Sequence, residues 1–394
     1  MQSSDAGAIK FDKCLWIRSG IMDTSSIFRS IRAALLEREI SILTLNGPRD
    51  DAGFEQIRKA VWASDKHVVM DGLMPHELKR LFPVFKDRRN FSMSMVDWWT
   101  SQHWYTRHAH YLIFRNYNGI AVRRGLGRFA AGRQAPLLAF PERWNFYAVA
   151  SCLLRGPGFL AAPFLEQWHN HIRQLETVPV ERLLYFPFTV LEEHVPVREE
   201  PPQYDFCNVS ANGGYWFMRD PYASSWLNWG NLYYDRLRLI QMLAAAGNGR
   251  YRVFDLRKSH YLKWDEYMKV VQGSRYAIAT GGLHQNSVAK YMEFACLGTP
   301  MIGEDLPFEY PWLTQCIYPV DGWSVTPQEL EKRLPEALGR QGKLRENCLN
   351  LRDSILKLYH PHRVLDLLQE QADGGAIPPG YLKPAAMDPA SDTA

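Results

Sequence analysis

Short apolar runs alternate along the chain with stretches in which apolar residues recur every three or four positions. Five such runs in the first half predict buried strands, at residues 13–17, 40–45, 67–70, 91–96 and 111–114. After the first run, a capping sequence of Asp, Thr and Ser at 23–26 precedes Ile and Leu residues at helical spacing. A strand, a helix and a strand with short joins predict a parallel pair. The first half therefore indicates an open, mainly parallel α/β sheet.

The same alternation resumes after residues 194–203, a Pro-rich, charged stretch without periodicity that is typical of a linker. The later strands are expected at 204–209, 250–254, 276–280 and 301–302, and the later helices at 234–246, 265–273, 288–297, 327–338, 343–359 and 363–371. We therefore expect two α/β domains. Their bounds are 1–193 for the first domain, 194–203 for the linker, 204–372 for the second domain with its closing helices, and 373–394 for a disordered tail.

The amino-acid composition and net charge exclude several classes of protein. The chain has 394 residues and a formal net charge of +4, which is too mild to favour a nucleic-acid binder. Its apolar runs are shorter than the roughly 18 residues that span a bilayer, and its six cysteines lack metal-finger spacing, so we expect a cytoplasmic protein with free thiols. Aromatic residues make up 13%, including 13 Trp, which favours flat apolar surfaces for a ligand.

Residues 280–300 carry the most informative pattern. A predicted strand ends in Gly281 and Gly282, which allow a ligand to approach the backbone closely, and a helix follows whose first N–H groups can bind an anion such as phosphate. Glu293 lies further along that helix among apolar residues, where a ribose diol would satisfy both of its oxygens. An ordinary loop, with Glu293 paired to Lys290, stays open as the structural alternative.

The run at 290–302, Lys-Tyr-Met-Glu-Phe-Ala-Cys-Leu-Gly-Thr-Pro-Met-Ile, resembles the carboxyl-terminal domain of GT-B glycosyltransferases. In that superfamily a glutamate in a Glu-(hydrophobic)-Ala-x-x-Gly-x-Pro run holds the ribose of a sugar nucleotide. The CgeB-like proteins of the glycosyl transferases family 1 group are the most similar: they have a basic residue where Lys290 stands and a closing element like Tyr-His-Pro-His-Arg at 359–363. The resemblance covers about residues 183–370 and extends to the first half only in layout.

The resemblance implies a GT-B fold, with two Rossmann-like domains that face each other across a cleft, and a nucleotide-sugar donor on the second domain. Glu293 would bind the ribose. The other donor-binding residues that it implies are Gly281, Gly282, Gln285, Asn286, Ser287, Lys290, Ser210, Asn212, Gly213 and Arg219. Because Gln285 stands where retaining family 4 enzymes have the first glutamate of an Glu-x7-Glu motif, the donor contacts and stereochemistry of that family are not carried over.

Transfer to an acceptor requires a base in an inverting enzyme, and strand-end carboxylates of the first domain are the natural candidates. Asp97 follows one predicted strand and precedes Trp98 and Trp99, which could stack on a sugar; a helix cap beside core tryptophans is the alternative. His284, in the predicted donor loop, is the second catalytic candidate. Arg18 and Gly20 follow the first strand and are the remaining acceptor-binding candidates.

These patterns predict a glycosyltransferase that moves a sugar from a nucleotide-sugar to a glycan, protein or small-molecule acceptor. We expect no cofactor and no bound metal, because GT-B enzymes neutralise the diphosphate with helix dipoles and basic side chains, and we find no DxD-type motif. Peripheral contact with the inner face of a membrane stays open. The alternatives are a GT-B-like epimerase or pyruvyl transferase, and a non-catalytic ligand-binding protein.

Overall fold

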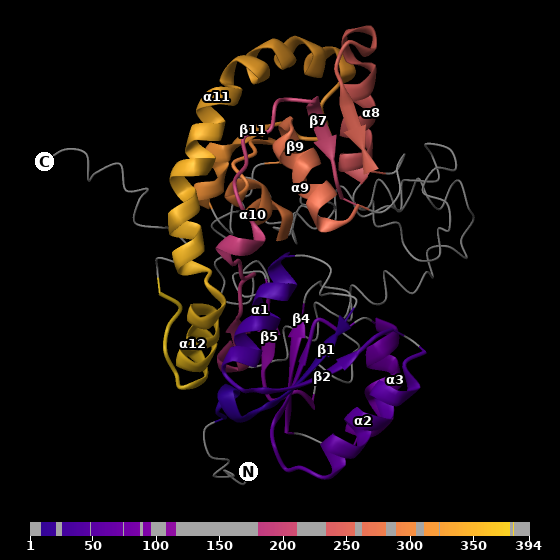
Figure 1. Cartoon of the computed structure of the whole chain (residues 1–394), viewed down its shortest axis with the longest axis vertical. Coiled ribbons are helices and arrows are strands. Elements are labelled where there is room, and N and C mark those ends of the chain that lie inside the picture. Colours follow the sequence, from indigo (N-terminus) through magenta and orange to yellow (C-terminus); the bar gives the residue numbers. More distant parts are fainter. Residues whose placement is uncertain are drawn as a thin grey trace, which may run out of the picture. The chain divides into compact units, whose positions relative to one another are not determined.

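The computed structural model describes residues 9–20, 26–47, 49–73, 75–86, 90–95, 108–115, 180–210, 234–256, 262–280, 289–304, 311–322, 324–378 and 381. Its contacts divide the chain into two compact units (Figure 1). Within the described residues, the first unit contains 9–115, 180–191 and 359–378, and the second contains 192–358. The first unit therefore receives both the beginning of the described chain and a helix near its end.

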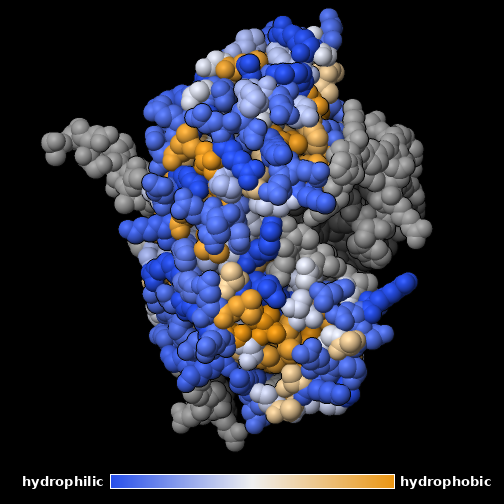
Figure 2. Space-filling model, in the orientation of Figure 1, coloured by the Kyte–Doolittle hydropathy of each residue, from blue (hydrophilic) through white to orange (hydrophobic). Residues whose placement is uncertain are grey.

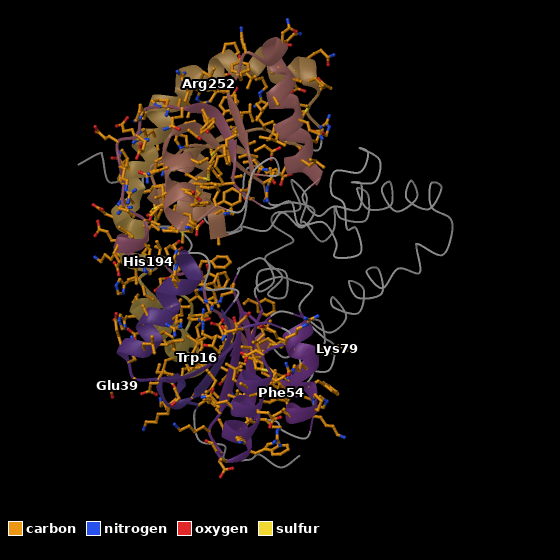
Figure 3. The ribbon with its side chains drawn as sticks, turned by 45° about the vertical axis from the view of Figure 1, so that its right-hand side comes forward. Trp16, Glu39, Phe54, Lys79, His194 and Arg252 are labelled. Atoms are coloured by element: carbon orange, nitrogen blue, oxygen red, sulfur yellow. The ribbon has the colours of Figure 1, made fainter. Side chains whose placement is uncertain are left out.

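The first unit is built on a six-stranded sheet whose recorded pairs are all parallel. Its strands are β1 (Leu15–Ser19), β2 (Ser41–Leu45), β3 (Val68–Asp71), β4 (Phe91–Met95), β5 (Leu112–Phe114) and β6 (Leu183–Tyr185), in the order β2-β1-β3-β4-β5-β6. Every residue of β1 and β3 is buried, as expected for parallel strands covered on both faces. Trp16, fully buried on β1, belongs to this core (Figure 3).

The second unit is built on a five-stranded sheet, also with parallel pairs. Its strands are β7 (Tyr204–Asn208), β8 (Val253–Asp255), β9 (Ser274–Ala279), β10 (Met301–Gly303) and β11 (Ile317–Pro319), in the order β11-β10-β9-β7-β8. Apolar side chains from β7, β9 and β10 form its core with helical residues such as Leu243 and Leu334. Hydrophilic residues cover most of this unit's surface on the face shown in Figure 2, with hydrophobic residues in small groups.

The helices connect these strands as Rossmann-like units require. The α-helices are α1 (Ser26–Glu37), α2 (Asp51–Trp62), α3 (Pro75–Phe85), α8 (Tyr234–Gly249), α9 (Trp264–Gln272), α10 (Ala289–Cys296), α11 (Pro327–Leu358) and α12 (Pro361–Ala372). Short 3₁₀ helices lie at Phe11–Lys13, Val180–Arg182, Glu192–His194 and Pro311–Cys316. The predicted fold class is confirmed: the chain contains two Rossmann-like α/β units, and each is built on a sheet of parallel strands.

Three expectations about the second half differ from the structure. A single helix, α11, replaces the two predicted at 327–338 and 343–359; Gly339 and Gly342 cost about 1 kcal/mol each relative to alanine, but buried Ala337 and Leu344 hold the helix on both sides of them. The expected linker begins at residue 194, whereas the second unit begins at residue 192. Residues 373–378 are described, with Ile377 buried, although we expected the disordered tail to begin there.

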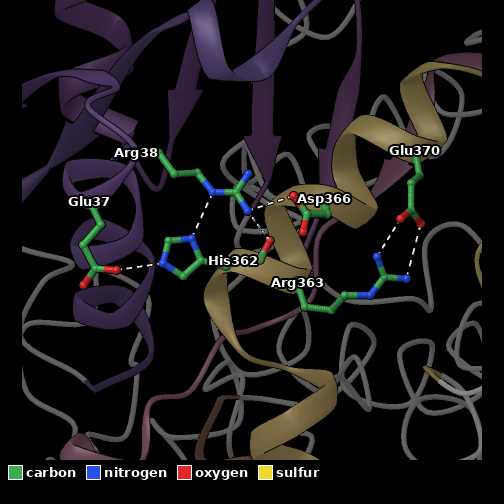
Figure 4. Close-up of polar contacts among 6 residues, drawn as sticks. All are labelled: Glu37, Arg38, His362, Arg363, Asp366 and Glu370. Atoms are coloured by element: carbon green, nitrogen blue, oxygen red, sulfur yellow. Dashed lines mark hydrogen bonds and ion pairs between the residues drawn. The ribbon is translucent and has the colours of Figure 1, made fainter.

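Helix α12 belongs to the first unit, whereas the sequence placed the closing helices in the second domain. Its first turn is held against α1 by side chains (Figure 4). Arg38 Nε donates to His362 Nδ1 at 2.9 Å, and His362 Nε2 lies 2.7 Å from Glu37 Oε2. Gln371, buried further along α12, donates to the carbonyl of Tyr185 on β6 at 2.7 Å and accepts from its N–H at 2.8 Å. These contacts explain why the helix docks on the first sheet.

Among the helices that the structure describes, none is long and apolar enough to span a membrane.

Candidate nucleotide site

The strand order of the second sheet places a switch point between β7 and β9. Chain connections leave β7 toward β8 on one side and reach β9 on the other, and open α/β sheets bind ligands outside the carboxyl ends of such strand pairs. Ser210 lies just beyond the end of β7, and Thr280 directly follows β9. Of the two donor-binding segments predicted from the sequence, at 210–213 and 281–287, the structure describes only Ser210, which lies at this switch point.

Hydrogen bonds fix both strand ends. Asn208, the last residue of β7, donates its side-chain amide to Asp255 Oδ1 on β8 at 3.2 Å, and its Oδ1 accepts from the Ser210 N–H at 3.3 Å. Arg236, in the first turn of α8, donates to the Thr280 carbonyl at 3.1 Å. Arg236 is only 3% exposed, so it brings a buried positive charge to the end of β9.

Glu293 lies on α10, one of the most buried helices of the unit, and is 1% exposed. Its carboxylate accepts a hydrogen bond from the Tyr267 hydroxyl of α9, with 2.7 Å between the phenolic oxygen and Oε2. An ionised carboxylate has only acceptors, so the phenol donates. Burial and then the neighbouring Glu293 charge raise the pKa of Tyr267 well above its usual value, which keeps the phenol protonated.

Lys290 lies one helical turn before Glu293 and completes what we call the Glu293 cluster: Glu293, Lys290 and Tyr267. The Lys290 ammonium is 4.4 Å from the centroid of the Tyr267 ring and 3.5 Å from its hydroxyl oxygen. Burial lowers the pKa of Lys290; the Glu293 charge opposes this shift and the Arg236 charge adds to it. The Arg236 guanidinium, at the end of β9, is therefore close enough to Lys290 for the two positive charges to repel each other.

The cluster has the groups that a ribose and a diphosphate require. A buried carboxylate can accept hydrogen bonds from two vicinal hydroxyls, and two cations, Lys290 and Arg236, can neutralise phosphate oxygens. The structural alternative of an ordinary Glu293–Lys290 pair does not describe the whole arrangement, because Tyr267 contacts both residues. Within the described ranges, no group of three or more His, Cys, Asp or Glu residues could hold a metal ion.

The first sheet has a switch point as well, between β1 and β3, and there the structure places a buried ion-pair network. Arg18 and Asp71 are register partners at the ends of these strands, and Arg18 Nη1 donates to Asp71 Oδ2 at 2.5 Å. Arg115, directly after β5, donates to the other Asp71 oxygen, and its guanidinium lies 4.0 Å from the centroid of the Phe186 ring. All three charged residues are 1% exposed.

This network changes the interpretation of Arg18, the predicted acceptor-binding residue. Arg18 also donates to the Phe28 carbonyl at 3.0 Å, so its guanidinium is bound to groups in the interior of the first unit. Direct contact with an acceptor would require the network to rearrange. Gly20 is partly exposed, and a Cβ at this position would meet the end of the Asn46 side chain, which would have to move.

Most of the remaining predicted site residues lie outside the described residues and stay predictions. They are Asp97, Trp98, Trp99, Asn212, Gly213, Arg219, Gly281, Gly282, His284, Gln285, Asn286 and Ser287.

Neither Tyr267 nor Arg236 was predicted from the sequence to lie at this site. Tyr267 occupies an ordinary buried position of the amphipathic helix α9, and nothing in its local sequence distinguishes it from a core tyrosine. Arg236 stands in the first turn of a helix, where the dipole does not favour a cation. This unfavourable position was the one feature of the sequence that could have indicated a special role for Arg236.

Comparison with known proteins gives similarity in structure but not in sequence. No family model matches the chain, and no curated protein sequence matches it. Similar solved structures include Anabaena Alr3699/HepE in complex with UDP and glucose, at 8% identity and a TM-score of 0.48 over 92% of this chain and 100% of that one. MurG of Acinetobacter baumannii aligns at 9% identity and a TM-score of 0.43 over 91% and 99%. A UDP-GlcNAc 2-epimerase from Neisseria meningitidis, bound to UDP-GlcNAc, aligns at 8% identity and 0.41 over 92% and 100%.

At these identities and scores, the assignment of the chain rests on its own topology. The chain contains two Rossmann-like units, each with a parallel sheet, and a helix near the end of the described chain belongs to the first unit. This two-unit α/β architecture is the one that the resemblance to GT-B enzymes predicts. The CgeB-like subgroup stays a prediction.

Proposed function

We propose that this protein is a glycosyltransferase that takes its sugar from a nucleotide-sugar bound at the switch point of the second sheet. The observation that carries the proposal is the convergence of independent features on one place. The predicted donor-binding residue Ser210 follows β7 and Thr280 follows β9, and the Glu293 cluster and Arg236 supply a buried carboxylate and two cations in the same unit, with Arg236 bonded to the Thr280 carbonyl. Fold alone does not decide function, so the proposal rests on these side chains.

In this proposal Glu293 accepts hydrogen bonds from the ribose hydroxyls. Lys290 and Arg236 face the diphosphate, where negative charge grows as the bond between the sugar and the leaving nucleotide breaks. Protein cations would do this without a bound metal. Asp97 remains the proposed base for the acceptor hydroxyl, and His284 the proposed second catalytic residue. The acceptor is proposed to be a glycan, a protein or a small molecule.

A thermal-shift panel with UDP, GDP, ADP, CMP and TDP, each with its common sugar conjugates, tests the donor site. A ligand at ~100 times its dissociation constant stabilises the protein by roughly 2.7 kcal/mol, which is seen as a higher melting temperature. We expect one nucleotide to give a selective shift, with and without EDTA. The absence of a shift with every member of the panel would contradict the proposal.

A transferase is then separated from an epimerase or a binding protein by the products formed with the selected donor. We expect release of the free nucleotide to accelerate when an acceptor mixture is added. Conversion of the sugar while it stays attached to the nucleotide would instead identify an epimerase. Binding without turnover in the presence of varied acceptor mixtures would favour the non-catalytic alternative.

A further inference from the structure

Tyr267 contacts both charged members of the Glu293 cluster, and its hydroxyl and its ring make different contacts. The hydroxyl donates to Glu293 Oε2 at 2.7 Å, while the ring lies 4.4 Å below the Lys290 ammonium. One side chain therefore interacts with the carboxylate through a directional hydrogen bond and with the cation through its π face. Removing the phenolic oxygen takes away the hydrogen bond to Glu293 and the 3.5 Å contact of that oxygen with the Lys290 ammonium, and leaves the π face in place.

The ring of Tyr267 is itself held by residues outside the cluster. Trp264 stacks on it, with ring centroids 4.7 Å apart and an interplanar angle of 19°. The Trp264 indole N–H donates to the His194 carbonyl at 3.0 Å, on the segment where the second unit begins (His194 is labelled in Figure 3). The first turn of α9 is further fixed by Glu266, whose carboxylate accepts from the Lys263 N–H at 3.0 Å.

A hydroxyl that is fixed in this way can determine where a carboxylate points. Tyrosine has only two side-chain torsions, and stacking on Trp264 restricts both, so the donor occupies one position on the Glu293 oxygen. A carboxylate that must meet two vicinal hydroxyls requires such an orientation, because hydrogen bonds weaken steeply when their angles depart from linearity. The 2′-hydroxyl is one of the two groups that the carboxylate would meet in a ribose.

We propose that Tyr267 is a positioning residue, which orients the Glu293 carboxylate toward the ribose and so sets the discrimination between ribonucleotides and 2′-deoxyribonucleotides. This inference rests on the proposed function, since it requires a nucleotide at the Glu293 cluster. It assigns to α9 a part in ligand selection that the pattern of the sequence does not predict.

The test compares dissociation constants by titration calorimetry for UDP, GDP, ADP and CDP and for their 2′-deoxy counterparts. For the diphosphate that binds, we expect the wild type to prefer the ribose form about tenfold or more, the worth of a hydrogen bond to a charged group. Tyr267→Phe keeps the stacked ring and the cation–π contact, and removes the hydroxyl from Glu293 and from Lys290. We expect this variant to bind the ribose form about tenfold more weakly and the deoxy form almost unchanged, so that the preference largely disappears.

Tyr318→Phe is the matched control. Tyr318 is also buried in the second unit, and its hydroxyl likewise lies 3.1 Å from a glutamate oxygen, Oε2 of Glu336, outside the cluster. It should keep the wild-type preference. A merely structural role of Tyr267 would lower the melting temperature or weaken both nucleotide forms equally, and would leave their ratio intact.

The possible failures are distinguishable. A wild-type preference that survives in Tyr267→Phe overturns the positioning role and leaves the proposed function standing. Equal binding of ribose and deoxy forms by the wild type overturns both the ribose role of Glu293 and the positioning role. The absence of binding by all four ribonucleoside diphosphates overturns the inference, and the absence of a shift with every member of the thermal-shift panel overturns the proposed function as well.

Discussion

The two sheets of this protein have the same relative strand order around their switch points, but they place different chemistry there. In the first sheet, Arg18 and Asp71 meet at the strand ends and are joined by Arg115. In the second sheet, the strands end in neutral residues, Asn208 and Thr280, and the buried Glu293 carboxylate on a nearby helix is held by a phenol. The same topology therefore accommodates, in one unit, a carboxylate that accepts directly from two guanidiniums and, in the other, a carboxylate that accepts from a phenol with an ammonium nearby.

The partners of Asp71 and Glu293 distinguish a structural carboxylate from one that is positioned for a ligand. Asp71 has a guanidinium at each oxygen, and although burial alone would raise its pKa, the charges of Arg115 and Arg18 outweigh burial and lower it. Glu293 accepts a hydrogen bond from the neutral Tyr267 phenol, and the Lys290 ammonium, whose charge interacts with that of Glu293, lies over the tyrosine ring. We therefore expect Asp71 to contribute to stability and Glu293 to contribute to binding.

The largest effect should follow from breaking the first network. Asp71→Asn leaves Arg18 and Arg115 buried without their shared carboxylate, which should cost about 3–5 kcal/mol in the free energy of unfolding, measured by urea denaturation. Arg363→Met is the control, because it breaks the partly exposed Arg363–Glu370 pair and should cost less than about 1 kcal/mol (Figure 4). Equal losses in the two variants would show that the network does not stabilise the fold.

For Glu293→Gln we expect the opposite result, a small change in stability and a large loss of nucleotide binding. The glutamine carbonyl can still accept from Tyr267, so we expect a change in unfolding free energy within about 1 kcal/mol. Loss of the charge should nevertheless weaken binding of the nucleotide selected by the thermal-shift panel about tenfold or more, measured by calorimetry. A stability loss as large as that of Asp71→Asn, with nucleotide affinity unchanged, would make Glu293 a second structural carboxylate.

The smallest expected effect is the loss, at acidic pH, of the stability that Asp71 contributes. Because the pKa of Asp71 is lowered in the folded state, its contribution to stability is complete above the unfolded-state value, near 3.9, and is lost as the pH falls through the lowered folded value. The stability difference between the wild type and Asp71→Asn should therefore be constant near neutral pH and shrink below about pH 4. Urea titrations from pH 6 to pH 2.5 measure it, and a difference that grows on acidification would contradict the lowered pKa.

The sequence predicted the fold class because each strand is a short apolar run and the helices have their own apolar spacing. It singled out Glu293 as a carboxylate among apolar residues, and the resemblance to GT-B enzymes added Lys290; their roles as donor-binding residues stay predictions. It could not predict Tyr267 or the Arg18–Asp71–Arg115 network, because these contacts join residues that are 26 positions apart in one case and 53 and 44 in the other. Long-range pairs of this kind depend on strand order, which apolar spacing does not reveal.

The return of α12 to the first unit has a consequence for synthesis on the ribosome. The first unit is interrupted after residue 191 and resumes at residue 359, so all of the intervening chain is made before α12 emerges. At 5–20 residues per second, this takes roughly 10–30 s. During that interval the nascent first unit lacks the helix whose Gln371 pairs with the backbone of β6. An exposed apolar face on that nascent unit is where a chaperone would be expected to bind.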